Sequence, residues 1–145
     1  MRSQRSGNHT VSRLTVHVVW STKYRHPVLV GDIKPRCREL LIQMCKAQDV
    51  KILKGVISSD HVHMRVGYPP KLAVSDLVKR MKGRTSRLLQ DEYPKLKKQF
   101  WGQHFWGGEY GAWSTGHITE EMVQEYLEHH RNLDDSDDSA FILEE

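Results

Sequence analysis

The sequence predicts an α+β fold of the ferredoxin-like (RRM-like) class, with the order β-α-β-β-α-β in an antiparallel sheet and an additional C-terminal helix. Three observations lead to this prediction. Short segments alternate apolar and polar residues, two longer segments repeat apolar residues at helical spacing, and a short polar join separates the second strand from the third. This fold class hosts many functions, so function has to be argued from individual residues.

The first strand is predicted over residues 14–20, where side chains alternate between two faces. One face carries Leu14, Val16, Val18 and Trp20, and the other carries Thr15, His17 and Val19. A basic turn over residues 23–27 ends the strand. Asp32 is placed to cap the first helix, whose apolar stripe consists of Ile33, Cys37, Leu40, Leu41 and Met44. Cys37 and Cys45 are interpreted as small core residues.

The second and third strands are predicted over residues 50–57 and 61–68. The polar join of residues 58–60 favours an antiparallel hairpin, and Pro69 and Pro70 end the third strand. The second helix is predicted over residues 74–89. Its inward face carries Val74, Leu77, Val78, Met81, Leu88 and Leu89, and its other faces carry Lys79, Arg80, Lys82 and Arg87.

The last elements follow a basic, irregular stretch over residues 93–103 and a glycine-broken aromatic run over residues 105–110. A fourth strand is predicted over residues 110–115. Thr119 is placed to cap the last helix, and Glu120 and Glu121 suit the positive end of its dipole.

Composition and charge indicate one domain with a polyanionic partner. Residues 1–133 form the predicted domain, and residues 134–145 form an acidic tail predicted to be disordered. The tail holds six acidic residues and no Lys or Arg, so the net charge of +4 for the whole chain becomes +10 for residues 1–133. Such a basic body favours phosphate chains, although a merely soluble basic domain would show the same charge. No signal core or membrane span is present in the sequence, so a cytoplasmic protein is expected.

The third predicted strand contains the strongest chemical signal. Its apolar residues Val62, Met64 and Val66 belong on the core face, so alternation sends His61, His63 and Arg65 to the opposite face. Two imidazoles at this spacing can bind one cation. The alternative is a pair of exposed histidines without a ligand.

The last predicted helix offers a nucleophile and a third ligand. Tyr126 and His130 lie one turn apart on its apolar stripe, and His129 is an alternative to His130. If this stripe faces the open side of the sheet, His130 completes a metal site and the Tyr126 phenol can attack a phosphate. The alternative is that both side chains simply pack on the core.

These residues, taken in order, resemble the TnpA-type transposases of the single-tyrosine HUH group, which mobilise insertion sequences of the 200/605 kind. The resemblance covers about residues 14–131. Its landmarks are Lys23-Tyr24-Arg25, Ser59-Asp60-His61-Val62-His63-Met64, Met81-Lys82-Gly83, Trp106-Gly107-Gly108 and Tyr126 in the last helix.

The resemblance implies that His61 and His63 hold a divalent ion, Mg²⁺ or Mn²⁺, and that Tyr126 cleaves single-stranded DNA through a 5′-phosphotyrosine intermediate. It also implies homodimers, recognition of DNA hairpins and no nucleotide cofactor. Many relatives have a Gln where this chain has His130. Three nitrogen ligands would favour Mn²⁺ or Zn²⁺ over Mg²⁺.

Phosphate contacts are expected from basic residues of the first turn and second helix, namely Lys23, Arg25, Lys79, Arg80, Lys82 and Arg87. Unpaired bases could stack on Trp101, Phe105, Trp106, Tyr110 and Trp113. Three other functions fit part of the pattern: a domesticated relative that processes chromosomal repeat hairpins, a non-catalytic single-stranded nucleic-acid-binding module, and a zinc hydrolase built on three histidines.

Overall fold

The computed structural model of the protein describes residues 5–6, 11–12, 14–99, 104–114, 120–129 and 142–144. The strands are β1 (Arg5–Ser6), β2 (Val11–Ser12), β3 (Thr15–Ser21), β4 (Lys51–Ile57), β5 (His61–Gly67), β6 (Gly111–Trp113) and β7 (Ile142–Glu144). The helices are α1 (Ile33–Ala47), α2 (Val74–Glu92), α3 (Lys95–Gln99), α4 (Glu120–His129) and the short 3-10 helix η1 (Lys23–Arg25).

The main sheet is antiparallel throughout and has the strand order β6-β3-β5-β4-β7. Its first four members correspond to the four predicted strands, and β3 and β5 are the central pair. The β-α-β-β-α-β order and the ferredoxin-like sheet are therefore confirmed. β1 and β2 form a separate two-stranded sheet.

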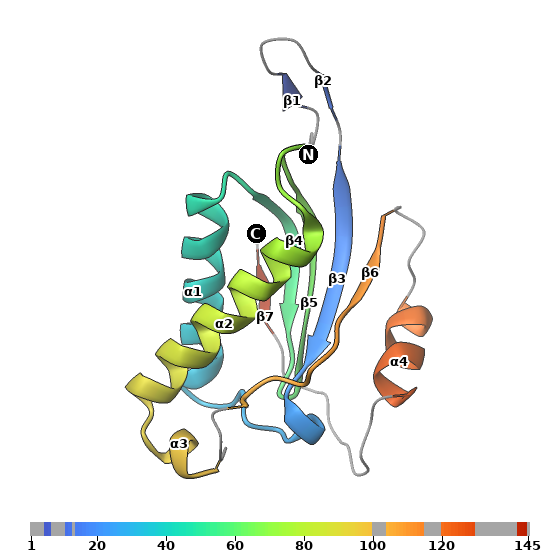
Figure 1. Ribbon diagram of the computed structural model, residues 1–145. Coiled ribbons are helices and arrows are strands. Elements are labelled where there is room, and N and C mark those ends of the chain that lie inside the picture. The colour runs from blue at the N-terminus through green and yellow to red at the C-terminus, as the bar shows by residue number, and fades with distance from the viewer. Residues whose placement is uncertain are drawn as a thin grey trace.

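One face of the sheet is covered by α1 and α2, as Figure 1 shows. The predicted inward side chains of β3 and β5 meet the apolar stripes of these helices, and Val18, Trp20 and Val62 are fully buried there. This continuous apolar cluster is the main source of folding free energy. Cys37 and Cys45 lie inside it as core residues without a disulfide, as predicted, and burial raises the pKa of Cys37 to about 12.

The opposite face of the sheet is partly covered by α4 (Figure 1). Val123 and Leu127 of α4 pack on Val19, which alternation places on this second face of β3. The last helix therefore lies where the predicted open side of the sheet is, and it brings Tyr126 to the face that carries the histidines of β5.

The structure also differs from the expectations in several places. Asp32 precedes α1 as predicted, but its side chain makes no capping hydrogen bond. The stretch expected to be irregular contains α3, and residues 142–144 of the expected disordered tail form β7 on the edge of β4. Thr119 and residues 130–141 lie outside the described residues. Among the helices that are described, none is long and apolar enough to cross a membrane.

Candidate active site

Alternation along β5 places the two histidines on the face opposite the main core. Val62, Met64 and Val66 are buried under α1 and α2, whereas Arg65 on the other face is exposed. His61 is buried, with 8% of its surface exposed, and His63 is partly exposed. Imidazoles on this face are suitable metal ligands for a site that a substrate reaches from solvent.

His61 is oriented by the residue before it. Its Nδ1 lies 2.8 Å from Oδ1 of Asp60, so the Nδ1 proton is donated to the carboxylate and the lone pair of Nε2 remains for a ligand. Metal-binding histidines commonly have such a carboxylate partner. Burial alone would raise the pKa of Asp60, but the hydrogen bond and charge of His61 and the charge of Arg25 together hold it below its usual value.

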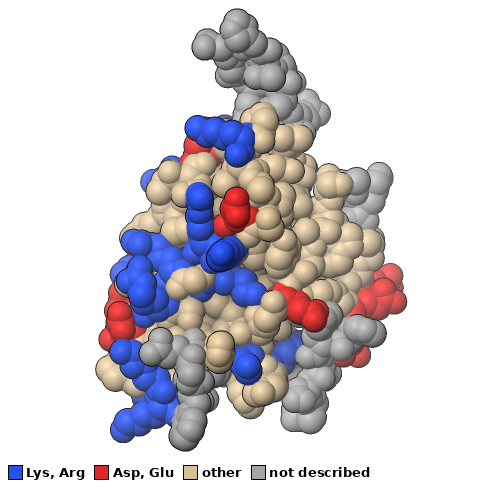
Figure 2. Space-filling model, viewed as in Figure 1, with Lys and Arg blue, Asp and Glu red and all other residues tan. Residues whose placement is uncertain are grey.

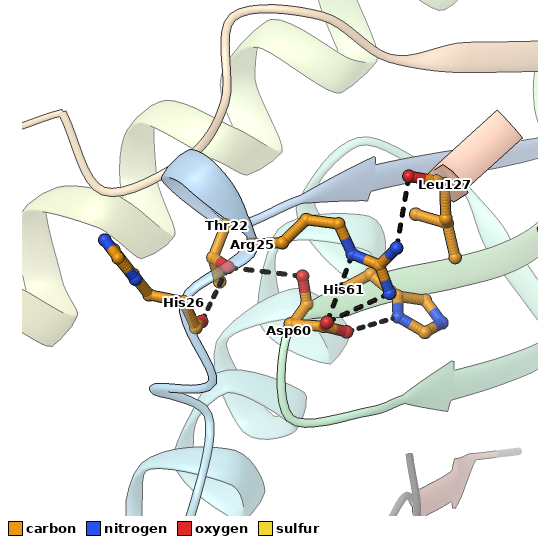
Figure 3. A network of polar contacts seen from close by, with 6 residues as sticks. All are labelled: Thr22, Arg25, His26, Asp60, His61 and Leu127. Carbon is orange, nitrogen blue, oxygen red and sulfur yellow. Dashed lines mark hydrogen bonds and ion pairs between the residues drawn. The ribbon is translucent and has the colours of Figure 1, made fainter. Parts of the chain in front are cut away.

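Arg25 holds the other oxygen of the same carboxylate, as Figure 3 shows. Its Nε and Nη2 lie 3.1 and 3.0 Å from Oδ2 of Asp60, and its Nη1 donates to the backbone oxygen of Leu127 in α4 at 3.1 Å. Thr22 donates its backbone N–H to the Asp60 carbonyl at 2.9 Å. Three segments distant in sequence therefore meet at Asp60 and Arg25.

His63 is close to a histidine of the neighbouring strand. Its Nε2 lies 3.2 Å from Nδ1 of His17, a residue of β3 on the same face of the sheet. Burial lowers the pKa of His63 to about 4, with further lowering by the charges of His17, His61 and Lys54. His63 is therefore neutral at physiological pH, which is the form that binds a metal.

Tyr126 lies over β6. Its ring meets Trp113 edge to face with the centroids 6.0 Å apart, and a Cβ on Gly111 would lie 3.3 Å from its Cδ1. The absence of a side chain at Gly111 therefore leaves room for the two rings. Burial, followed by the negative charge of Glu109, raises the pKa of Tyr126 to about 12. The phenol must therefore be assisted if it is to lose its proton near neutral pH.

The donor set fits a divalent ion as a two-histidine site. Two imidazoles are available on one face, one neutral by burial and one oriented by a carboxylate. In the part of the chain that the structure describes, no group of three or more His, Cys, Asp or Glu side chains could hold a metal. The predicted third ligand His130 lies outside that part, as does the side chain of His129.

The predicted phosphate contacts fall into two groups. Lys79, Arg80 and Arg87 are exposed on α2, and Figure 2 shows Lys and Arg gathered over this part of the molecule. α2 covers the sheet face opposite the histidines. Arg80 also donates to the side-chain oxygen of Gln48.

The other predicted contacts are engaged within the protein. Lys82 donates to the backbone oxygen of Gly107 at 2.8 Å, and the side chain of Arg25 is only 8% exposed. The ammonium of Lys23 lies over the ring of Tyr24, 5.3 Å from its centroid. Arg25 is therefore less suited to a surface phosphate contact than the α2 residues are.

The aromatic run has a structural role. Phe105 and Trp106 are 0% and 6% exposed, and the Trp106 Nε1–H donates to Oγ1 of Thr85 at 2.9 Å. Neither is available for base stacking. Tyr110 and Trp113 are partly exposed, and Trp101 lies outside the described residues. The most exposed aromatic side chain described is Tyr24, at 62%.

Sequence reasoning did not assign site roles to Asp60, His17 or Tyr24. Asp60 directly precedes the first histidine, and an acidic residue there could have indicated a partner for the imidazole. His17 could have been found from the alternation of β3, which puts it on the same face as His63. No sequence signal shows that Arg25 points inward.

The chain is similar to known transposases. The model of the family described as "Transposase IS200 like" matches residues 10–130. The chain is 31% identical to the ISDra2 transposase TnpA of Deinococcus radiodurans, over 86% of this chain and 89% of that protein. It is 30% identical to the transposase for insertion sequence element IS200 of Salmonella typhimurium, over 89% of this chain and 84% of the relative.

Two solved structures are also similar. The crystal structure of a transposase candidate from Deinococcus radiodurans R1 has a TM-score of 0.82 and 28% identity, covering 89% of this chain and 99% of the other. A REP-associated tyrosine transposase bound to a REP hairpin has a TM-score of 0.56 and 12% identity, covering 86% of this chain and 67% of the other. The second likeness concerns the fold alone.

Proposed function

The chain belongs to the family of IS200-like transposases, which gives it an enzymatic role in DNA rearrangement, and we propose that it cleaves and rejoins single-stranded DNA through Tyr126. One observation carries this proposal. Packing of α4 on β3 brings Tyr126 to the sheet face that presents His61 and His63. A histidine pair and a tyrosine on one face supply the ligands and the nucleophile that phosphodiester cleavage requires.

The reaction consists of two exchanges of one bond for another. In cleavage, Tyr126 Oη attacks a DNA phosphorus, the bond from phosphorus to the 3′ oxygen breaks, the phenol loses its proton and the 3′ oxygen gains one. The product is a 5′-phosphotyrosine with a free 3′-hydroxyl. In rejoining, another 3′-hydroxyl attacks the same phosphorus and the phenol regains its proton. Because each step replaces one phosphodiester by another, no nucleotide cofactor is needed.

His61 and His63 would hold the divalent ion, Mg²⁺ or Mn²⁺, with His130 as the proposed third ligand. When bound, such an ion neutralises charge on the phosphate oxygens and favours ionisation nearby. Asp60 keeps the proton of His61 on Nδ1, and burial keeps His63 neutral. α4 holds the Tyr126 ring against Trp113, which restricts the directions from which the phenol can attack.

Single-stranded DNA carrying hairpins is the proposed substrate. The structurally similar REP-associated transposase is bound to a REP hairpin, and this chain exposes Lys79, Arg80 and Arg87 on α2. These cations would contact phosphates without reading sequence. We also propose that the protein works as a homodimer, as its family resemblance implies.

The proposal is tested with a labelled single-stranded hairpin oligonucleotide from the flanking DNA, incubated with Mn²⁺, Mg²⁺ or EDTA. Wild-type protein should form a denaturant-stable protein–DNA adduct only with metal, and Tyr126→Phe should form none. Tyr93→Phe is the matched control, because the Tyr93 hydroxyl donates to the Asp32 carbonyl, in the main core region away from α4. Binding of the hairpin without any adduct in wild type would rule out the nuclease proposal.

A further inference from the structure

The turn after β3 has an unusual backbone. Tyr24 and Arg25 both have φ of 55°, in the left-handed region that residues with a side chain rarely adopt. Two consecutive residues of this kind store strain that the surrounding contacts must offset. The conformation sends the two side chains in different directions, since Tyr24 is 62% exposed and the Arg25 side chain is 8% exposed.

The guanidinium of Arg25 connects β5 and α4. It contacts Oδ2 of Asp60 with two nitrogens, and its third nitrogen donates to the Leu127 carbonyl at 3.1 Å (Figure 3). The other oxygen of Asp60 accepts the His61 Nδ1 proton at 2.8 Å. One carboxylate and one guanidinium therefore link the first histidine to the residue that follows Tyr126.

The Leu127 carbonyl is a suitable acceptor for physical reasons. Leu127 lies in the C-terminal turn of α4 (Glu120–His129). The negative end of the helix dipole also lies there. A cation that donates to this carbonyl complements the helix dipole.

The other described packing of α4 on the body is small. Val123 and Leu127 meet Val19, and Tyr126 meets Trp113. This cluster is separate from the main core and has few members. A charge-assisted hydrogen bond therefore makes a considerable contribution to the docking of the helix.

We propose that Arg25 is a positioning residue, which docks the tyrosine helix α4 onto the histidine strand β5 through Asp60. Its part in catalysis rests on the proposed function, but the docking itself does not. Asp60 serves two partners, so a change that moves α4 also changes the support of His61. Arg25 was expected from sequence to contact DNA phosphate, and the positioning role makes a different prediction for a lysine at this position.

Amide hydrogen exchange of the α4 segment 121–128, measured in EDTA and without DNA, tests the docking. Arg25→Gln and Arg25→Lys should each raise its exchange rate about tenfold or more, the effect of losing a charged hydrogen bond. Lysine has one nitrogen and cannot contact Asp60 and the Leu127 carbonyl with the spread of three nitrogens that arginine has. Thermal unfolding and exchange in β3 and α1 show whether each variant is folded.

Arg36→Gln is the matched control. Arg36 also uses three nitrogens, which donate to the carboxylates of Glu92 and Glu39, but it lies on α1. It should leave exchange in α4 unchanged. Unchanged α4 exchange in both Arg25 variants would overturn the proposal, as would an equal rise in Arg36→Gln.

A second measurement separates positioning from phosphate contact. In single-turnover assays with the hairpin oligonucleotide and Mn²⁺, Arg25→Lys should lower the rate of adduct formation about tenfold or more while the hairpin Kd stays within about twofold. If residue 25 only contacted DNA phosphate, Arg25→Lys would keep both the adduct rate and the hairpin Kd of wild type. Loss of hairpin affinity with an unchanged adduct rate would overturn the positioning role. Absence of adduct in wild type, together with faster α4 exchange in the Arg25 variants, would contradict the nuclease proposal alone and leave the docking intact.

Discussion

At the scale of single residues, the histidines differ in how the protein prepares them. His61 is oriented by Asp60, whereas His63 is made neutral by burial and by its cationic neighbours. The pKa of the neighbouring His17 is also lowered, first by burial and then by the charge of Arg65. Geometry therefore orients His61, whereas burial keeps His63 neutral at physiological pH.

The pKa of His63 leads to a prediction for stability. Its pKa is about 4 in the folded protein and 6.5 for an ordinary histidine, so between these values the unfolded chain binds a proton that the folded chain does not. The free energy of unfolding should therefore fall as pH decreases from about 6.5 to about 4 and show no further loss from this group below that. After a discount for partial exposure, the loss is about 2 kcal/mol.

Denaturant unfolding of wild type and His63→Asn in EDTA, at several pH values between 7 and 4, measures this effect. The difference in unfolding free energy should shrink or reverse as pH falls, since the variant lacks the group that titrates. The other charged or titratable groups around His63 are present in both proteins, namely His17, His61, Lys54 and Arg65. A difference that is constant across the range would contradict the assigned pKa.

At the scale of elements, the contact between β6 and α4 sets the position of Tyr126, the proposed nucleophile. A Cβ at Gly111 would lie 2.6 Å from Cη2 and 2.9 Å from Cζ3 of Trp113, and 3.3 Å from Cδ1 of Tyr126. The indole has to move, and the tyrosine that packs edge to face on it has to follow.

Gly111→Ala should therefore impair chemistry more than folding. We expect a loss of about 1–3 kcal/mol in unfolding free energy from overpacking, and a fall in adduct rate well beyond any change in hairpin affinity. Gly108→Ala is the control, because a Cβ there would meet nothing within 4 Å. Equal adduct rates for the two variants would show that the Trp113–Tyr126 packing does not position the phenol.

Elements with a clear period could be predicted from sequence, and contacts between distant elements could not. Alternation over residues 14–20 and 61–68 identified β3 and β5 and the faces of their histidines, because a strand with one buried face must alternate. The apolar stripe of the last helix does face the open side of the sheet, where Val123 and Leu127 pack on Val19. α3 and β7 were missed, since the first is short and basic and the second lies in an acidic tail.

The candidate site, like the fold, could be predicted where it follows from the pattern of a single element, but not where it depends on contacts between distant elements. The histidine pair follows from the pattern of one strand, whereas the contact of Arg25 with Leu127 joins residues 102 positions apart. A residue in a left-handed turn carries no periodic signal, so a basic turn was expected to face solvent and DNA. Phe105 and Trp106 were candidates for base stacking because aromatic residues serve cores and nucleic-acid surfaces equally well.

At the scale of the whole molecule, the sheet separates two regions for which we propose functions. The exposed cations lie on α2, which covers one face of the sheet, and α4 lies against the other face, to which alternation directs the histidines of β5 (Figure 1). DNA that is held by α2 must therefore pass an edge of the sheet to reach these histidines, or use the site of another copy. The side chain of Lys82 reaches the backbone of the loop before β6, and so joins α2 to the strand beside Tyr126.

The cations of α2 should contribute affinity rather than chemistry. Replacing Lys79 and Arg87 by Gln should weaken hairpin binding and reduce the slope of log K against log salt by about 1 for each phosphate that the variant no longer neutralises. The adduct rate at saturating DNA should stay close to that of wild type. Lys46→Gln, an exposed lysine of α1, is the control, and an unchanged slope in the double variant would place the DNA elsewhere.

The central claim is that Tyr126 is the nucleophile of a site built on His61 and His63. Its most direct test is mass-spectrometric mapping of the covalent protein–DNA adduct, formed with Mn²⁺ on a hairpin oligonucleotide from the flanking DNA and trimmed by nuclease. A 5′-phosphonucleotide should appear on the peptide that contains Tyr126, and it should be lost in His61→Asn and His63→Asn while hairpin binding persists. An adduct on any other residue, or one that forms equally well without both histidines, would contradict it.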